Sequence, residues 1–265
     1  MMKMTFEIYR KINELLKNRE KFAVATIIRS KGSSPRDKGA KMIIRENGKT
    51  IGTIGGDRLE EKIKKMSLAA LQENETRTVE MKLEEDKMDM KCGGEVEVYI
   101  EIPKPASKLL IIGSGKIASA LAEFGTKIRF EVTIVDPFLQ KKDLPSPVNA
   151  VKKPIEEGIG EIATDSQTYI VVTTRHKYDK EALLASLRTE APYIGLVGSK
   201  NRVKSIFNSL NDKEVKKEEL KRINAPVGLD IGAETPEEIA ISILSEIIRE
   251  KRDENATGES LRINA

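Results

Sequence analysis

The sequence predicts an α/β protein in which a smaller N-terminal α+β domain precedes a C-terminal, Rossmann-like, doubly wound parallel sheet. Four short apolar segments, at 109–112, 130–135, 168–172 and 192–197, alternate with helical stretches, which is the rhythm of βαβ units. The first hundred residues lack this alternation and place apolar strands between glycine-rich turns. With 265 residues, two domains are expected, at 1–104 and 105–265.

The elements of the N-terminal domain follow from apolar periodicity and from turn residues. Apolar residues at Phe6, Tyr9, Ile12, Leu15 and Leu16 predict a helix with one buried stripe. The segment "ENGK" predicts a hairpin, because Asn-Gly favours tight turns. The proline-containing segment "PKPASK", at 103–108, predicts a linker. The expected helices lie at 5–18 and 58–72, and the expected strands at 22–28, 41–45, 76–83 and 95–102, with a short strand ending in "GTIGGD".

Two further segments lie in the C-terminal part of the sequence. The charged segment "LNDKEVKKEELKR" predicts a solvated helix or loop without chemistry. The segment "ETPEEIAISILSEIIREK" predicts a helix that begins with a capping box. Its N-cap is Thr235, its first helical residue is Pro236, and Glu238 lies three residues after the cap. Ile239, Ile243, Leu244 and Ile247 are expected to form its buried stripe.

Composition excludes several classes of protein. The 46 basic and 42 acidic residues are interspersed, so no one-signed field is expected and nucleic acid is not an expected partner. No apolar run approaches the ~18 residues of a membrane span, and the first residues lack a signal-peptide pattern. A single Cys is typical of a reducing, cytoplasmic location. One Cys and one His also make a zinc site unexpected, and no metal site is predicted.

The stretch "LLIIGSGKIASALAEFG" carries a dinucleotide-binding fingerprint between a strand and a helix. Gly113 permits a tight turn, Gly115 lets the backbone approach a phosphate, and Ala118 lets the helix pack closely on the sheet. Asp136 follows the next strand at the spacing of a carboxylate that binds ribose hydroxyls. The alternative is that the glycines serve packing alone and that Asp136 caps the turn before Pro137.

Polar residues follow the later strands at the same expected sheet edge. "VVTTRHKYD" supplies Thr174, Arg175 and the single histidine, His176. "LVGSKNR" supplies Gly198, Ser199 and Lys200. Arg175 and Lys200 favour binding of an anionic group at this edge. For the turn "PVGLDIGAE", a purely structural need for glycine is an equal alternative.

The N-terminal loops add a second set of candidates. "GSSPRDKGAKM" contains Ser33 and Arg36, and Gly55-Gly56 opens a helix, where backbone N–H groups can bind anions. Cys92 lies in "KCGG" beside Lys91, which can lower the pKa of a thiol. The alternative for a single Cys is an inert, small hydrophobic residue.

Hydride transfer needs a group that exchanges the substrate's hydroxyl proton, and His176 is the candidate. No separate substrate-binding constellation follows it, and a Tyr-x-x-x-Lys relay is absent from the sequence. The fingerprint therefore predicts nucleotide binding more strongly than it predicts a dehydrogenase.

Seven segments follow one another along the chain: "GSSPRDKGAKM", "GTIGGDRLEE", "CGGEVEVYIE", the Gly113 fingerprint, "TTRHKYD", "GLVGSK" and "PVGLDIGAETPEEIAISILSEII". Together they resemble the xanthine dehydrogenase accessory protein family, XdhC/CoxI. The resemblance implies an N-terminal family domain joined to a Rossmann domain, commonly as a homodimer. It also implies binding of the molybdenum cofactor, as molybdopterin in a mono- or dinucleotide form. The family's work would be sulfuration of that cofactor with a cysteine desulfurase and its delivery to a molybdenum hydroxylase of the xanthine or carbon monoxide dehydrogenase type.

Two positions depart from the family pattern. Asp57 stands where a third glycine is usual, and Arg175 and His176 are adjacent where the family often has Thr-Arg-Gly-His. We expect a cofactor chaperone rather than a turnover enzyme, with the N-terminal and C-terminal candidates on two sides of a cleft and Cys92 as a sulfur carrier. The alternatives are an NAD(P)-dependent oxidoreductase, in which Asp136 would select NAD, and a non-catalytic nucleotide-binding regulator.

Overall fold

The computed structural model describes residues 2–32, 36–83, 94–140, 147–175, 178–211, 215, 217–252 and 256–259. The chain forms two compact units, Met1–Pro105 and Ala106–Ala265, and each has its own sheet. Among the residues described, no helix is long and apolar enough to cross a membrane. The predicted α/β class, with an antiparallel N-terminal sheet and a parallel C-terminal one, is confirmed.

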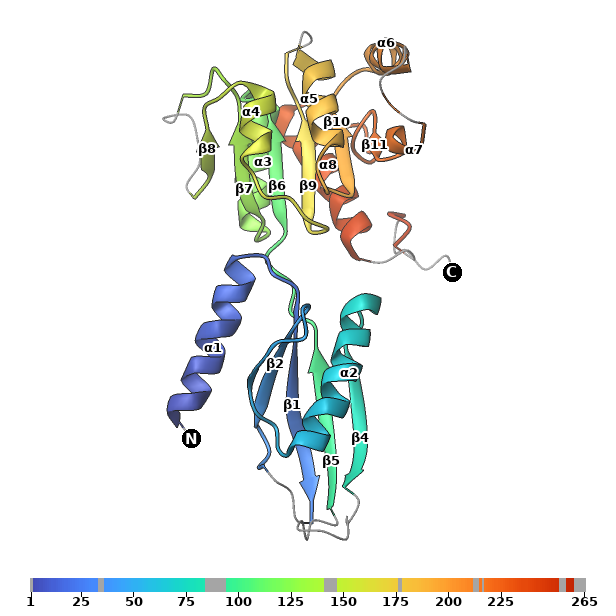
Figure 1. Ribbon diagram of the computed structural model, residues 1–265. Helices are drawn as coiled ribbons and strands as arrows, with labels where there is room; N and C mark the ends of the chain where they lie inside the picture. Colours follow the sequence, from blue (N-terminus) through green and yellow to red (C-terminus); the bar gives the residue numbers. More distant parts are fainter. Residues whose placement is uncertain are drawn as a thin grey trace. The chain divides into compact units, whose positions relative to one another are not determined.

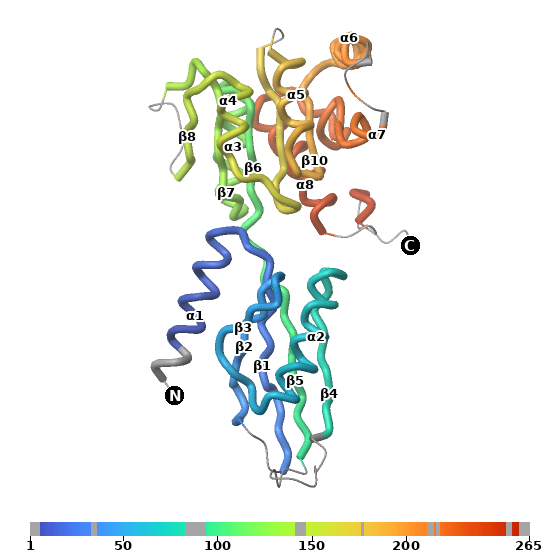
Figure 2. The backbone as a smooth tube through the Cα atoms, viewed as in Figure 1, coloured from blue at the N-terminus to red at the C-terminus, as the bar shows by residue number. Residues whose placement is uncertain are grey.

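The N-terminal unit is a five-stranded antiparallel sheet with a helix on each face (Figure 1). Its strands stand in the order β3-β2-β1-β5-β4. Figure 2 follows the chain through the two helices and the strands between them. The elements are α1 (Met2–Lys17), β1 (Phe22–Lys31), β2 (Lys41–Arg45), β3 (Thr50–Gly52), α2 (Asp57–Glu73), β4 (Arg77–Leu83) and β5 (Gly94–Glu101).

The central strand β1 is buried on both faces, which is why its sequence is a continuous apolar run. Ala25 and Ile27 pack with the α2 side of the sheet, whereas Phe22 and Val24 pack with α1. The predicted stripe of α1 is partly wrong, because Phe6 and Tyr9 are 71% and 54% exposed. The helix packs through Ile8, Ile12 and Leu15, whose spacing of four and three residues forms one face, and the two aromatic residues lie off that face.

The C-terminal unit is a six-stranded sheet in which every pairing is parallel, in the order β11-β10-β9-β6-β7-β8. Numbered along the chain from β6, this order is 3-2-1-4-5-6 read from β8, the arrangement of dinucleotide-binding sheets. The strand order reverses between β6 and β9. The strands are β6 (Lys108–Ile112), β7 (Glu131–Val135), β8 (Asn149–Val151), β9 (Thr168–Val172), β10 (Tyr193–Leu196) and β11 (Ile223–Asn224).

Helices cover both faces of this sheet. One buried cluster joins strand residues to α3 and α8, and a second joins the opposite strand residues to α4, α5 and α6 (Figure 1). The capping box that the sequence predicts is present, since the Glu238 N–H donates to Thr235 Oγ1 (3.2 Å) and the Thr235 N–H donates to Glu238 Oε2 (3.0 Å). The helices are α3 (Lys116–Lys127), α4 (Ile155–Gly160), α5 (Asp179–Leu187), α6 (Lys200–Asn211), α7 (Lys217–Leu220) and α8 (Pro236–Arg252).

The predicted linker and the charged segment that was expected to be solvated both contribute to the packing. The segment 103–108 reaches into the sheet, because Lys108 is only 6% exposed and its Nζ donates to the Ala163 carbonyl at 2.6 Å. In the charged segment after α6, Arg222 donates to the carbonyl oxygens of Leu187, Thr189 and Ala191 at 2.9, 2.8 and 2.6 Å. Arg222 thereby satisfies the Leu187 carbonyl at the end of α5 and two carbonyls of the turn that follows the helix.

Candidate functional site

Gly113 brings the ends of β6 and β9 together where the strand order reverses. Its φ is +116°, and a Cβ at this position would lie 2.5 Å from the Thr173 carbonyl oxygen. The Thr173 N–H in turn donates to the Ile112 carbonyl at 2.8 Å. Only glycine suits both the backbone conformation and the close approach, so the first fingerprint glycine shapes this edge of the sheet.

Gly115 begins α3 without a side-chain cap. Its backbone is extended, at φ −78° and ψ −176°, and no atom lies within 4 Å of where a Cβ would stand. The first turn of α3 contains no acidic residue, and Ala118 is fully buried against the sheet. The first N–H groups of a helix have no intrahelical acceptors and carry its partial positive charge. The beginning of α3 is therefore open to an anionic group.

Asp136 holds the neighbouring turn. Its Oδ2 accepts a hydrogen bond from Ser114 Oγ at 2.8 Å, and its Oδ1 accepts one from the Phe138 N–H at 2.7 Å. The second bond is the turn-capping role that the sequence left open, while the first fixes the carboxylate beside the fingerprint glycines. A carboxylate accepts hydrogen bonds from hydroxyls and repels phosphate, so this position favours an unphosphorylated ribose.

Arg175 joins an aromatic pair at the same edge. Its guanidinium carbon lies 5.8 Å from the centroid of the Phe138 ring, and that ring lies 6.1 Å from the ring of Tyr178. Phe138 is 53% exposed, which is unusual for so large an apolar side chain. The sequence reasoning missed both aromatic residues. The signal that could have found them is their place two or three residues beyond Asp136 and Arg175.

Thr174 belongs to a buried ion-pair network. Its Oγ1 donates to Asp179 Oδ1 at 2.5 Å, and Arg202 Nε donates to Asp179 Oδ2 at 2.8 Å, with a further contact from the second guanidinium nitrogen. Asp179 is 1% exposed and the Arg202 side chain is 20% exposed. The hydroxyl of Thr174 therefore supports the scaffold, and Asp179 is a structural residue that the sequence reasoning missed.

Two of the candidate residues after β10 also support the scaffold. Ser199 Oγ accepts a hydrogen bond from the Arg202 N–H at 3.3 Å, as an N-cap of α6. A Cβ at Gly198 would lie 3.3 Å from Arg202 Cδ, so glycine leaves room for that side chain. Lys200 is exposed. The structure places all three at the carboxyl edge, one strand beyond β9.

The turn at Gly55-Gly56 already binds an anion of the chain itself. Glu60 Oε1 accepts hydrogen bonds from the N–H groups of Ile54 and Gly55, at 3.2 and 3.3 Å, and from the Thr53 hydroxyl at 2.5 Å. Gly56 is the N-cap of α2. Asp57, the departure from the family pattern, lies in the first turn of that helix, where a negative charge suits the helix dipole.

The remaining N-terminal candidates lie in the segments that follow β1 and precede β5. Ser33, Cys92 and also His176 lie outside the described residues, and Arg36 is exposed. Lys31 pairs with Glu95 in the sheet, so the described residues that flank the segments of Ser33 and Cys92 lie beside each other. The predicted roles of Ser33 and Cys92 stay predictions.

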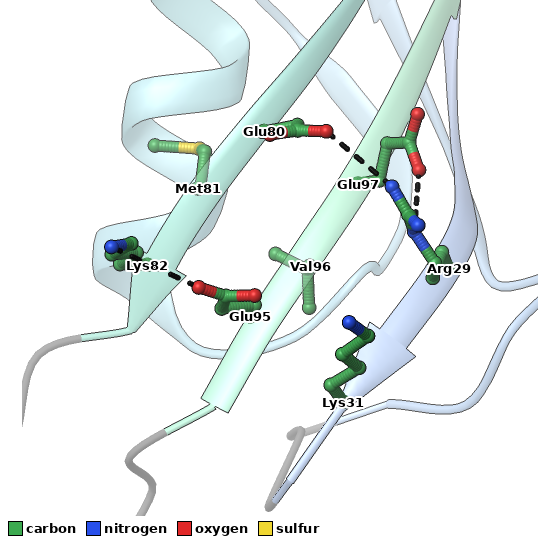
Figure 3. Close-up of a pocket in the computed structure, with 8 residues that line it drawn as sticks. All are labelled: Arg29, Lys31, Glu80, Met81, Lys82, Glu95, Val96 and Glu97. Atoms are coloured by element: carbon green, nitrogen blue, oxygen red, sulfur yellow. Dashed lines mark hydrogen bonds and ion pairs between the residues drawn. The ribbon is translucent and has the colours of Figure 1, made fainter.

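A hollow of about 440 Å³ lies on the sheet surface near these flanking residues (Figure 3). Arg29 Nε contacts Glu97 Oε2 at 2.8 Å, a second nitrogen of Arg29 contacts Glu80 Oε1 at 3.4 Å, and Lys82 Nζ contacts Glu95 Oε1 at 3.9 Å. Lys31 completes three cations facing three carboxylates. Because the charges balance, this hollow does not extend the predicted anion site. Among the described residues, no group of three His, Cys, Asp or Glu could hold a metal ion.

Comparison with known proteins identifies both units. Residues 109–247 match the model of the XdhC Rossmann domain, and residues 15–82 match that of the XdhC and CoxI family. The first match alone covers more than half of the chain.

Three relatives illustrate the range of similarity. The uncharacterized protein YqeB of Escherichia coli (strain K12) is 34% identical over 244 residues, which are 89% of this chain, but this chain spans only 44% of YqeB. A Bacillus subtilis (strain 168) protein described as a probable xanthine dehydrogenase subunit is 23% identical, with 91% of this chain and 96% of the relative covered. A solved structure described as a xanthine dehydrogenase from Bacillus halodurans is 22% identical with a TM-score of 0.48, over 91% and 96% of the two chains.

Proposed function

The chain belongs to the XdhC and CoxI family, and from this premise we propose that it is an accessory protein that binds the molybdenum cofactor for a molybdenum hydroxylase. The observation that carries the proposal is the open beginning of α3 at Gly115, beside a carboxylate held by Ser114. In this role the protein is a chaperone that holds and hands on its ligand, and it needs no acid–base pair for turnover.

The residues at this edge fit the charged part of such a cofactor. Molybdopterin carries a phosphate, or a pyrophosphate when extended to a dinucleotide, and the N–H groups at the start of α3 could receive it where Gly115 leaves space. Arg175, exposed beside Phe138, adds a positive charge. Asp136 suits the hydroxyls of a ribose in a dinucleotide form. Bound there, the cofactor would supply the molybdenum chemistry, and these residues would orient it.

The finer parts of the proposal concern partners. We propose that the target is a hydroxylase of the xanthine or carbon monoxide dehydrogenase type, that a cysteine desulfurase supplies sulfur, and that the protein works as a cytoplasmic homodimer. Cys92 is the proposed sulfur carrier. A Cys92→Ser variant that still supports full sulfuration of the target would remove that role.

The test uses two matched glycine substitutions. Gly115→Val adds a side chain where nothing lies within 4 Å, so the fold should be kept while approach of a phosphate is blocked. Gly160→Val at the end of α4 is the control, because no atom lies within 4 Å there either. The protein would be incubated without oxygen with cofactor released from a purified molybdenum hydroxylase. After gel filtration, protein-bound molybdenum and pterin would be measured.

Wild type and Gly160→Val should retain the cofactor, and Gly115→Val should retain at least about tenfold less at an unchanged melting temperature, because a steric block at a phosphate contact removes charge-assisted hydrogen bonds. Equal retention by all three proteins would refute the location. No retention by wild type would refute the function.

The second candidate function is binding of NAD, as an oxidoreductase or as a regulator. It is favoured by the strand order and by Asp136, which follows β7 as the ribose-binding carboxylate of NAD enzymes follows their second strand. Titration with NAD in the same experiment separates the two. Binding of NAD without retention of pterin would favour this candidate, and a turnover assay with NADH would then distinguish enzyme from regulator.

A further inference from the structure

The helix α8 has a second apolar stripe that folding of the C-terminal unit does not use. Ala240, Ile243, Leu244 and Ile247 face the interior, as the sequence predicts. Ile241 and Ile248 are 48% and 40% exposed, and they are seven residues apart on another face. Folding of the monomer requires only the buried stripe of this helix. A second apolar stripe that faces water adds no stability to the monomer.

The exposed stripe has the spacing of a coiled-coil seam. The partly exposed Ser245 lies between the two isoleucines, so the steps from Ile241 to Ser245 to Ile248 to Arg252 are four, three and four residues. The small serine at the middle allows the axes of two helices to come close. A helix of 17 residues is about 25 Å long, enough for this seam to run for about three turns.

Charges at the two ends of the stripe make it complementary to itself. Glu237 is exposed in the first turn of α8, and Arg252 is exposed at its end. A twofold axis near the middle of the helix would place Ile241 against the partner's Ile248 and Glu237 near the partner's Arg252. The same charges suit the helix dipole of a monomer, but that dipole does not account for the exposed isoleucines.

We propose that α8 is the homodimer contact of this protein, in which two copies pack antiparallel along Ile241, Ser245 and Ile248. Such an interface is isologous, since each copy uses the same surface. The surface beside the seam can contribute as well. Lys251 lies with its Nζ 5.1 Å from the Phe130 ring, and Ile128, two residues before Phe130, is 41% exposed. The inference specifies the surface of the homodimer included in the proposed function.

The first test is the mass of the full chain in solution, by gel filtration with light scattering and by sedimentation at several concentrations. Wild type should be a dimer at micromolar concentration. Ile248→Glu should raise the dissociation constant at least about tenfold, because it places a charge in the seam against the partner's Ile241. Phe6→Glu is the matched control, since Phe6 is a more exposed apolar residue on α1 of the other unit.

A charge exchange tests the antiparallel arrangement. Glu237→Arg and Arg252→Glu should each weaken the dimer about fivefold at low salt, because each change disturbs two symmetry-related pairs. The double variant should recover most of the wild-type affinity. A monomeric wild type, or a dimer unaffected by Ile248→Glu, would overturn the proposal, and a double variant no tighter than the singles would overturn the antiparallel pairing. Cofactor retention by a monomeric variant is measured separately, so failure of the dimer leaves the proposed ligand testable.

Discussion

The ion pair of Asp179 and Arg202 offers the sharpest test of how the candidate site is supported. Asp179 begins α5, Arg202 lies in α6, and Thr174 follows β9, so one buried carboxylate ties three segments of the carboxyl edge together. We predict that Asp179→Asn, which keeps the shape of the side chain and removes its charge, destabilises the C-terminal unit.

The magnitude follows from burial. Removing one partner of a buried ion pair costs about 3–5 kcal/mol, because the other charge stays without compensation. The Arg202 side chain is 20% exposed, so partial hydration favours the lower end, about 3 kcal/mol. For a unit of this size, 1 kcal/mol corresponds to a shift of about 2–4 °C, and the expected decrease in melting temperature is about 6–12 °C. Arg202→Gln should cost more, because the carboxylate that it leaves is 1% exposed.

The assay is calorimetric unfolding of the full chain for both single variants and for the double variant. If the pair acts as a unit, the double variant should be more stable than the sum of the two single effects predicts, by more than about 1 kcal/mol. Additivity within about 0.5 kcal/mol, or a shift of less than about 2 °C for Asp179→Asn, would refute the reasoning.

Three further predictions concern the same unit. Gly113→Ala should lower stability by more than Gly39→Ala, because both glycines have positive φ but only Gly113 faces a carbonyl at 2.5 Å; equal melting temperatures would show that the turn adapts. Tyr193→Phe should cost about 1–3 kcal/mol in chemical unfolding, because buried Glu246 loses a hydroxyl donor at 2.7 Å and, within the described part of the chain, keeps the Gly228 N–H; an unchanged midpoint would contradict this. Hydrogen bonds from the backbone N–H groups of Thr235 and Glu234 lower the pKa of Glu238 below its ordinary value of 4.5. The Glu238 carboxylate therefore stabilises the folded state above pH 4.5, and this contribution is lost as the pH falls through the lowered folded-state pKa. Thermal unfolding of Glu238→Gln between about pH 5 and 3 should therefore depend less on pH than that of wild type.

The sequence predicted the long elements well because their apolar patterns are long enough to be distinctive. It missed β8 and β11, which have three and two residues and therefore no measurable periodicity. It also assigned Lys108 to a linker, because of the prolines before it, and Arg222 to a solvated segment, because a charged side chain is ordinarily exposed. Both side chains instead donate to carbonyl oxygens that other segments bring to them, and such partners are distant in sequence.

The candidate site was predicted in part. Gly113, Gly115 and Asp136 could be placed together at one sheet edge because their spacing reflects the geometry of one turn and the strand after it. The role of Thr174 could not be found in this way, since its partner Asp179 is five residues away and that carboxylate is held by Arg202 on another helix. Phe138 was missed because exposure of an aromatic residue depends on tertiary packing, which a local pattern does not contain.

Two of the glycine-containing turns differ in how open the helix that follows them is to an anion. Each opens a helix, and each was predicted to bind an anion. At Gly55 the anion is the carboxylate of Glu60, four residues after the N-cap Gly56, and it accepts hydrogen bonds from the turn N–H groups of Ile54 and Gly55. At Gly115 the corresponding fourth residue is Ser119, the first turn has no acidic residue, and no side chain caps the helix. A glycine turn before a helix therefore favours an external anion more when the helix supplies no carboxylate of its own, and on that criterion the beginning of α3 is the better candidate for a phosphate than the beginning of α2.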